Sequence, residues 1–259
     1  MVLLLSGYKM TLKLKNLVLT RAKTLNFLEK LAAAPDDINL TLYLPPRLPT
    51  SELENLLEEA RSPADITGKL LDITVRSFTG AAIFWGAVQK YVVVPPFPVA
   101  AKSVIRSLDA APLQSLLNQD YRIGIVLVRL GSYAVGVCRG DKLVSSKLGT
   151  GLVHGRHRQG GSSAHRFERH RDKQIESFLI RVCGHTREHL EPYVKSMDYI
   201  VYGGARTTIL MLQKYCPLLG KLDKPVLPPL LDIPEPRRAV LESAISRVWS
   251  STIYDWTES

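Results

Sequence analysis

Glycine and basic residues concentrate in one stretch of the chain, Gly151 to Val182. Its first half has glycines at positions 151, 155, 160 and 161, and glycine pairs serve where the backbone needs positive φ or must approach another group closely. Ser162 or Ser163 then offers an N-cap. After it, apolar residues recur at helical spacing: Phe167, Ile175, Phe178, Leu179 and Val182. We therefore predict a glycine-rich loop followed by a helix with one buried face.

Six cations also lie within eighteen residues of this stretch: Arg156, Arg158, Arg166, Arg169, Arg171 and Lys173. Arginine in the first turn of a helix opposes the helix dipole, which costs about 0.3–1 kcal/mol for each residue. An anionic partner explains the cations better than helix stability does, and they are spread too widely for one phosphate. The pattern predicts contact with a nucleic-acid backbone. A basic surface loop without a partner is the structural alternative.

The net charge of the 259 residues is +10, and its distribution indicates which part of the chain contacts nucleic acid. Residues 1–120 carry 13 Lys/Arg against 11 Asp/Glu, whereas residues 121–259 carry 21 against 13. Cys138, Cys183 and Cys216 are widely spaced, form no CxxC pattern and predict no disulfide framework. No segment has the length of a membrane span or of a signal-peptide core, so we expect a cytoplasmic protein without a membrane partner.

The first part of the chain has the pattern of a small α+β domain. We expect a strand or arm and a helix within residues 1–34, a strand at Ile38–Leu44, and a helix from Thr50 or Ser51. A hairpin follows, formed by AAIFWG and YVVV around residue 89. The proline-rich segment after it places a domain boundary near residue 98. Residues 99–120, with Val104, Ile105 and Leu108, predict a helical linker.

The second part has the pattern of a sheet with helices. Strands are expected near residues 123–128, 133–138, 142–148, 199–202 and 226–231, the last at an edge because it contains two prolines. Helices are expected in the basic stretch, at 207–219 and at 236–256. This order is that of an RNase H-like domain with a mixed five-stranded sheet, which we place at residues 121–259. The predicted fold class is α+β or α/β, and the order alone says nothing of chemistry.

Three kinds of chemistry are disfavoured by the residues present. An RNase H-like nuclease needs carboxylates on its first strand to hold Mg²⁺, and Arg122–Arg129 contains none. The pairs His154/His157 and His165/His170 have spacings similar to zinc ligands, but arginines surround them, so we expect no metal site. No GxGxxG or Walker pattern predicts a nucleotide cofactor. Gly203-Gly204 favours a tight turn after a strand over a phosphate site.

The segment RQGGSSAHRFERHRDKQ, after a three-strand meander, resembles a known family. The family is the bacterial branch of the peptidyl-tRNA-hydrolysing release factors of ribosome-associated quality control, which are related to the eukaryotic class I peptide release factor. The resemblance covers about residues 121–256 and is most specific in Gly155–Lys173. A weaker likeness extends to LTLYLPP and KYVVVPPFPV in the first part of the chain.

The resemblance implies a mechanism for ribosome rescue. A glycine loop, here residues 154–164, would enter the peptidyl-transferase centre and help water attack the ester of peptidyl-tRNA. The implied catalytic residues are Gly160, Gly161, Ser163 and Ala164. The residues implied to bind RNA are Arg156, Arg158, Gln159, Arg166, Arg169, Arg171 and Lys173. The implied partners are large-subunit rRNA and peptidyl-tRNA, with no cofactor.

Ala164 departs from the family at the deciding position. The family has glutamine shortly after the glycine pair, where its amide orients water, and alanine has no donor or acceptor in its side chain. Three explanations stay open: an introduced inactivating substitution, a naturally inactive member, or catalysis by backbone groups. Gln159 also carries a side-chain amide, but it precedes the glycine pair and so is displaced from the position of the family's glutamine. The alternative function is a non-catalytic rRNA- or tRNA-binding module of the large ribosomal subunit.

Overall fold

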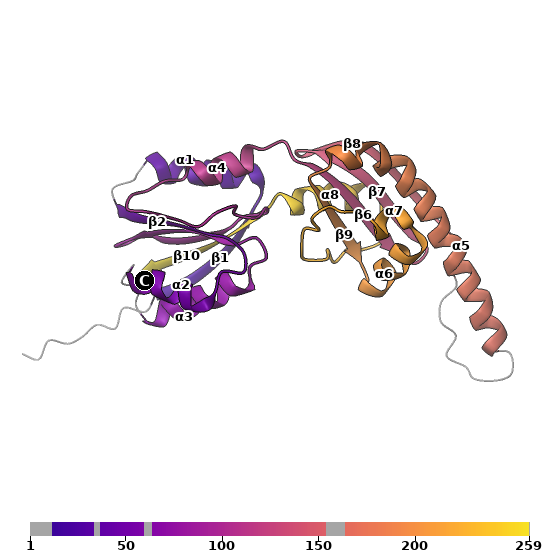
Figure 1. Cartoon of the computed structure of the whole chain (residues 1–259), viewed down its shortest axis with the longest axis horizontal. Coiled ribbons are helices and arrows are strands. Elements are labelled where there is room, and N and C mark those ends of the chain that lie inside the picture. The colour runs from indigo at the N-terminus through magenta and orange to yellow at the C-terminus, as the bar shows by residue number, and fades with distance from the viewer. Residues whose placement is uncertain (1–11, 34–36, 60–63, 154–163, 259) are drawn as a thin grey trace, which may run out of the picture. The chain divides into compact units, whose positions relative to one another are not determined.

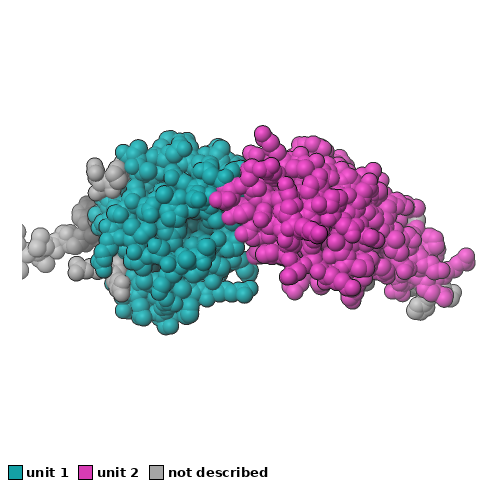
Figure 2. All heavy atoms as spheres, turned by 45° about the horizontal axis from the view of Figure 1, so that its top comes forward, with its two compact units in different colours: residues 1–118, 249–259 teal, residues 119–248 magenta. Residues whose placement is uncertain are grey.

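In the computed structural model the structure describes residues 12–33, 37–59, 64–153 and 164–258. The chain forms two compact units, Met1–Asn118 with Trp249–Ser259 and Gln119–Val248, shown in two colours in Figure 2. This division differs from the predicted one at both ends. Residues 99–118 belong to the first unit and are not a separate linker, and residues 249–259 belong to the first unit and not to the second.

The first unit is a six-stranded antiparallel sheet covered by helices on both faces (Figure 1). Its elements are β1 (Leu12–Leu19), α1 (Arg21–Ala33), β2 (Ile38–Leu44), α2 (Thr50–Glu59), α3 (Ala64–Arg76), β3 (Ala81–Gly86), β4 (Lys90–Val94), β5 (Ser103–Ile105), α4 (Ala111–Asn118) and β10 (Ser251–Glu258). The strand order is β1-β10-β4-β3-β2-β5. Tyr43 packs with α1 and α4, whereas Leu42 and Leu44 pack with α2 and α3. Because both faces are covered, β3 is buried along its whole length.

The structure confirms the strand at Ile38–Leu44, the helix from Thr50 and the antiparallel hairpin of β3 and β4. The helix expected around Val104 and Ile105 is wrong, because these residues form β5 and pair with β2. A run this short fits a helix or a strand equally, and its pairing partner lies about sixty residues earlier in the chain. Helix α3 was not predicted.

Residues 251–258 correct a second prediction. The expected helix at 236–256 ends at Val248, as α8 (Arg238–Val248), and the chain then forms β10 between β1 and β4. Ile253 and Trp256 are 2% and 1% exposed. The segment STIYDWTE is rich in β-branched and aromatic residues, which suit a strand, and pairing on both sides satisfies its backbone hydrogen bonds.

The second unit contains a four-stranded sheet and its helices. Its elements are β6 (Arg122–Arg129), β7 (Ser132–Arg139), β8 (Lys142–Thr150), α5 (Ala164–Leu190), the 3-10 helix η2 (Glu191–Ser196), β9 (Tyr199–Gly204), α6 (Arg206–Tyr215), α7 (Pro217–Gly220) and α8. The sheet order is β8-β7-β6-β9, with the first three strands antiparallel and β9 parallel to β6. Helices α5, α6 and α7 share one hydrophobic core with the sheet, and α8 contacts β7.

This order confirms the RNase H-like arrangement and the mixed α and β fold class. The fifth strand is corrected, because residues 226–231 make only two isolated parallel bridges to β9, Ile200 with Val226 and Gly203 with Leu231. Pro228 and Pro229 lie between the bridges and have no N–H to donate to a ladder.

Gly204 ends β9 in a conformation that requires glycine. Its φ is 117°, and an added Cβ would lie 2.0 Å from the carbonyl oxygen of Val128. The tight turn predicted for Gly203-Gly204 is therefore present, and close packing on β6 accounts for Gly204. Within the described residues, no helix is both long and apolar enough to cross a membrane.

Candidate functional site

Helix α5 carries the basic residues, and only part of it is packed. It begins at Ala164 and has 27 residues, so it extends to Leu190, past Val182, the last apolar position of the predicted buried face. Ile175, Phe178, Leu179 and Val182 lie in the core as predicted. Phe167, predicted on the same buried face, is 56% exposed. The reason is visible in Figure 1, where the N-terminal part of α5 extends past the sheet, so the sheet does not cover this part of the helix.

Three of the four predicted cations of this projecting part lie on one face of the helix. Arg166, Arg169 and Lys173 are exposed, and their spacing of three and four residues places them within an arc of about 60°. This arc points away from the side that packs on the sheet further along α5. Arg171 differs, because it is half-buried and lies on the flank nearer the core. The structure therefore groups three of the four predicted helical cations.

The acidic residues of the same segment lie on another side. Glu168 and Asp172 are four residues apart and lie roughly 90–130° around the helix from the centre of the cationic arc. Arg166, Arg169 and Lys173 are thus set apart from these two acids around the helix, whereas Arg171 lies on the same side as Glu168. Separation of this kind gives an anionic surface one cationic face to bind.

The chain enters the glycine loop from a fixed point on the sheet. The amide of Gly151 donates to the carbonyl of Gly131 at 2.9 Å, and Arg181 of α5 donates to the carbonyl of Thr150 at 3.2 Å. A Cβ on Gly151 would lie 2.7 Å from a ring carbon of Phe178, so the strand end packs closely on α5. The contacts with Arg181 and Phe178 hold the end of β8 against the packed part of α5, and the bond to Gly131 joins it to the turn between β6 and β7.

Several predicted site residues lie outside the described part of the chain: Arg156, Arg158, Gln159, Gly160, Gly161 and Ser163. Ala164 is the first residue of α5, directly after the loop. The loop is therefore joined to an anchored strand end on one side and to the projecting, cationic end of α5 on the other.

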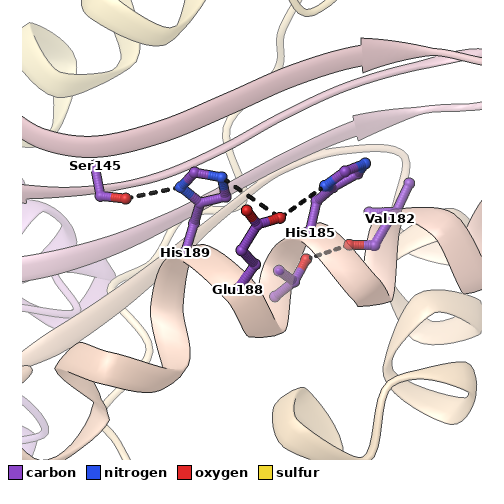
Figure 3. A network of polar contacts seen from close by, with 6 residues as sticks. Ser145, Val182, His185, Glu188 and His189 are labelled. Atoms are coloured by element: carbon purple, nitrogen blue, oxygen red, sulfur yellow. Dashed lines mark hydrogen bonds and ion pairs between the residues drawn. The ribbon is translucent and has the colours of Figure 1, made fainter.

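A polar network attaches the other end of α5 to β8 (Figure 3). Ser145 Oγ lies 2.8 Å from His189 Nδ1, and His185 Nδ1 lies 3.2 Å from Glu188 Oε2. His189 Nε2 lies 3.9 Å from the same Glu188 oxygen. The hydrogen bond from His185 lowers the pKa of Glu188 below its ordinary value. The sequence shows these three helical residues within one turn, but only the fold brings Ser145 to them.

Tyr133 of β7 adds a stacking contact to this attachment. The centroid of its ring lies 5.8 Å from the centroid of the His185 ring, with an angle of 16° between the two ring planes. Tyr133 is 1% exposed, and burial raises the pKa of its hydroxyl. Together with the core residues, these contacts attach the C-terminal half of α5 to the sheet, and the N-terminal half continues the same helix beyond the sheet.

The metal and nuclease alternatives gain no support from the described residues. No group of three or more His, Cys, Asp or Glu side chains suited to a metal ion is present among them. The four strands of the second sheet contain no Asp or Glu, so the carboxylates of a two-metal nuclease have no place on it. His154 and His157 lie outside the described residues.

The cysteines are structural. Cys138, Cys183 and Cys216 are all free and buried. Burial raises the pKa of the Cys138 thiol to about 12 and is the main cause of a similar rise, also to about 12, at Cys183. Thiols with such pKa values are almost entirely protonated near neutral pH and are poor nucleophiles.

A meander that leads through a glycine loop into a long cationic helix, with β9 parallel to β6, defines an RNase H-like domain of the release-factor type. Residues 121–254 match the family model described as Actinobacteria/chloroflexi VLRF1 release factor. The match covers more than half of the chain, and the chain belongs to this family.

Curated proteins with similar sequences are also named as release factors. Peptide chain release factor subunit 1 of Archaeoglobus fulgidus is 26% identical over 196 residues, which are 65% of this chain and 48% of that protein. The protein of the same name from Methanococcus maripaludis is 29% identical over 126 residues, 46% of this chain and 30% of that protein. The chain thus spans about half the length of the first relative and less of the second.

Solved structures with similarity include the archaeal translation termination factor aRF1. It aligns over 88% of this chain and 70% of its own, with 17% identity and a TM-score of 0.38. Pelota of Archaeoglobus fulgidus aligns over 94% of this chain and 64% of its own, with 12% identity and a TM-score of 0.25.

Proposed function

We propose that this chain is a ribosome-associated peptide release factor that hydrolyses the ester of peptidyl-tRNA on stalled or obstructed large ribosomal subunits. The observation that carries the proposal is the cationic arc of Arg166, Arg169 and Lys173 on the projecting part of α5, directly after the Gly160-Gly161 loop. In this proposal the arc binds rRNA phosphates, and α5 directs the loop toward the tRNA terminus. Arg156, Arg158, Gln159 and Arg171 add contacts to RNA.

The chemistry requires a positioned water and stabilisation of the developing negative charge. Gly160 and Gly161 supply backbone N–H groups and permit close approach, because they have no Cβ. Ser163 supplies a hydroxyl next to Ala164, which takes the position where the family has glutamine. Without an amide at residue 164, backbone groups and Ser163 orient the water, and we expect release to be slow in the chain as it stands.

The test is a single-turnover assay on purified large subunits that carry peptidyl-tRNA. Ala164→Gln should raise peptide release by about 10²–10³, the value typical of one positioned donor. Ser177→Gln is the matched control, because Ser177 is exposed on the same helix and the substitution adds the same amide away from the loop. Gly160→Ala or Gly161→Ala should remove the activity gained by Ala164→Gln.

The second candidate is a non-catalytic module that binds rRNA or tRNA on the large subunit. The observation in its favour is Ala164 itself, which has no side-chain group to orient water. The same assay separates the two functions. If Ala164→Gln binds large subunits but releases no peptide above the uncatalysed rate, the enzymatic proposal is wrong and the binding module replaces it.

A further inference from the structure

A second basic feature lies at the C-terminal end of α5, at the other end of the helix from the glycine loop. Residues of α5, η2, α7 and the segment after α7 line a groove of about 640 Å³. Volumes of 300–1,000 Å³ are typical of sites for small ligands. The residues that line it were not singled out by the sequence, because Arg187, Lys195, Lys221 and Lys224 are scattered along it.

The rim of this groove is cationic. Arg187 Nε lies 3.5 Å from the carboxylate of Glu191, so these two charges are paired. Lys195, Lys221 and Lys224 remain, against one further acid, Asp223. Within the described part of the chain, none of the three lysines makes an ion pair. Three lysines around one opening provide several N–H donors for an anion.

The floor of the groove is apolar and held in place. Val194, Leu218 and Leu222 are half-buried and line it. Leu218 and Leu222 also pack against the core that α5, α6 and α7 share with the sheet. The apolar surface is therefore fixed by the fold and is not formed by loose side chains. A ligand that fills the groove would meet charge at its rim and hydrocarbon beneath.

We infer that the groove binds a nucleotide of single-stranded RNA. Its phosphates contact Lys195, Lys221 and Lys224, and its unstacked base lies on Leu218 and Leu222. A regular duplex presents phosphates and keeps its bases stacked, so it would not use the apolar floor. Single-stranded RNA offers both an exposed base and a charged backbone.

The groove is separate from the cationic arc of α5. Lys173 and Arg187 are fourteen residues apart on one helix, or about 21 Å along its axis. One phosphate cannot contact both places, so the helix would carry two RNA contacts at a fixed separation. Two linked contacts raise the apparent affinity above that of either one. The identity of this RNA as large-subunit rRNA rests on the proposed function, but the presence of an RNA site does not.

The experiment measures binding of the full chain to a short fluorescein-labelled single-stranded RNA as a function of salt. The variant is Lys195→Ala/Lys221→Ala/Lys224→Ala. The matched control, Lys23→Ala/Lys30→Ala/Lys69→Ala, removes the same charge from exposed positions of the first unit. The groove variant should lower the slope of log K against log salt by about 1–2, since each phosphate contact on single-stranded RNA contributes about 0.7. The control should keep the slope of the parent.

A second arm uses the unmodified chain and RNA containing 4-thiouridine, with photo-crosslinks located by mass spectrometry. Crosslinks within residues 191–196 or 217–224 support the groove. Equal salt slopes for the groove variant and the control, or crosslinks confined to residues 156–173, overturn it. A third result would also overturn it: a Glu-rich peptide binds the parent as tightly as the RNA does, and the groove variant loses affinity for both equally. The groove would then recognise charge alone. Peptide release is not measured, so failure here leaves the release assay to decide the proposed function.

Discussion

Ser145 Oγ lies 2.8 Å from His189 Nδ1 and so joins the middle of β8 to the last turn of α5 (Figure 3). The same helix begins at Ala164, next to the glycine loop, and its first turns extend past the sheet. The bond therefore holds the packed end of a helix whose other end carries the candidate site. Its loss should loosen the helix without removing any residue of that site.

We expect His189→Ala to lower the free energy of unfolding by about 0.5–1.5 kcal/mol, the usual contribution of one hydrogen bond. Ser177→Ala, at an exposed position of the same helix, should stay within about 0.5 kcal/mol of the parent. Urea unfolding of the parent, of each single variant, of Ser145→Ala and of the double variant Ser145→Ala/His189→Ala measures the coupling energy between Ser145 and His189. Additive effects of Ser145→Ala and His189→Ala would show that the two side chains do not interact.

Ionisation of Glu188 should make the stability of the fold depend on pH in the acidic range. Its pKa in the folded protein is lowered from the ordinary 4.5, mainly by the hydrogen bond from His185. A carboxyl with a depressed folded pKa stabilises the fold above its unfolded pKa, and this contribution is lost as pH falls through the folded pKa. Melting temperatures from pH 5.5 downward should therefore fall less steeply for Glu188→Gln than for the parent. Parallel curves would contradict this role of Glu188.

Substitution by alanine at two glycines of the second unit should change the stability of the fold in opposite directions. Gly204→Ala should destabilise the fold by at least about 1–3 kcal/mol, because alanine is strained at φ 117° and its Cβ would meet the Val128 carbonyl. Gly184→Ala should stabilise it by about 0.5–1 kcal/mol, because Gly184 is inside α5 and a Cβ there meets nothing within 4 Å. Chemical unfolding measures both changes. A neutral Gly204→Ala would remove the steric explanation of the turn.

The cationic arc of α5 should govern binding to large ribosomal subunits. Replacing Arg166, Arg169 and Lys173 together by alanine should weaken binding and lower its salt slope by about 2–3, if each cation contacts one phosphate. The Lys23→Ala/Lys30→Ala/Lys69→Ala variant is again the control, since it removes equal charge from the first unit. Cosedimentation at several salt concentrations gives both slopes. Unchanged binding by the α5 variant would mean that the arc is a solvated face.

The meander and the basic helix could be predicted from local sequence. The strands β6, β7 and β8 are short apolar or alternating runs, joined by turns at Gly131 and Gly140 whose φ values of 102° and 59° suit glycine. Each partner strand lies next to the other in the chain, so the signal for pairing is local. The cations of α5 were visible for the same reason, since a helix places residues three and four apart on one face.

The sequence by itself therefore determined the elements whose partners are neighbours in the chain, and it located the glycine loop and the basic helix that follows. The tertiary structure alone decided the elements whose partners are distant. Residues 251–258 form β10 because β1 and β4 leave a space between them in the sheet, and no local pattern records that space. Phe167 is exposed because the sheet ends before α5 does, although its spacing matches the buried stripe. Helical periodicity shows which residues share a face, but what covers that face depends on the rest of the fold.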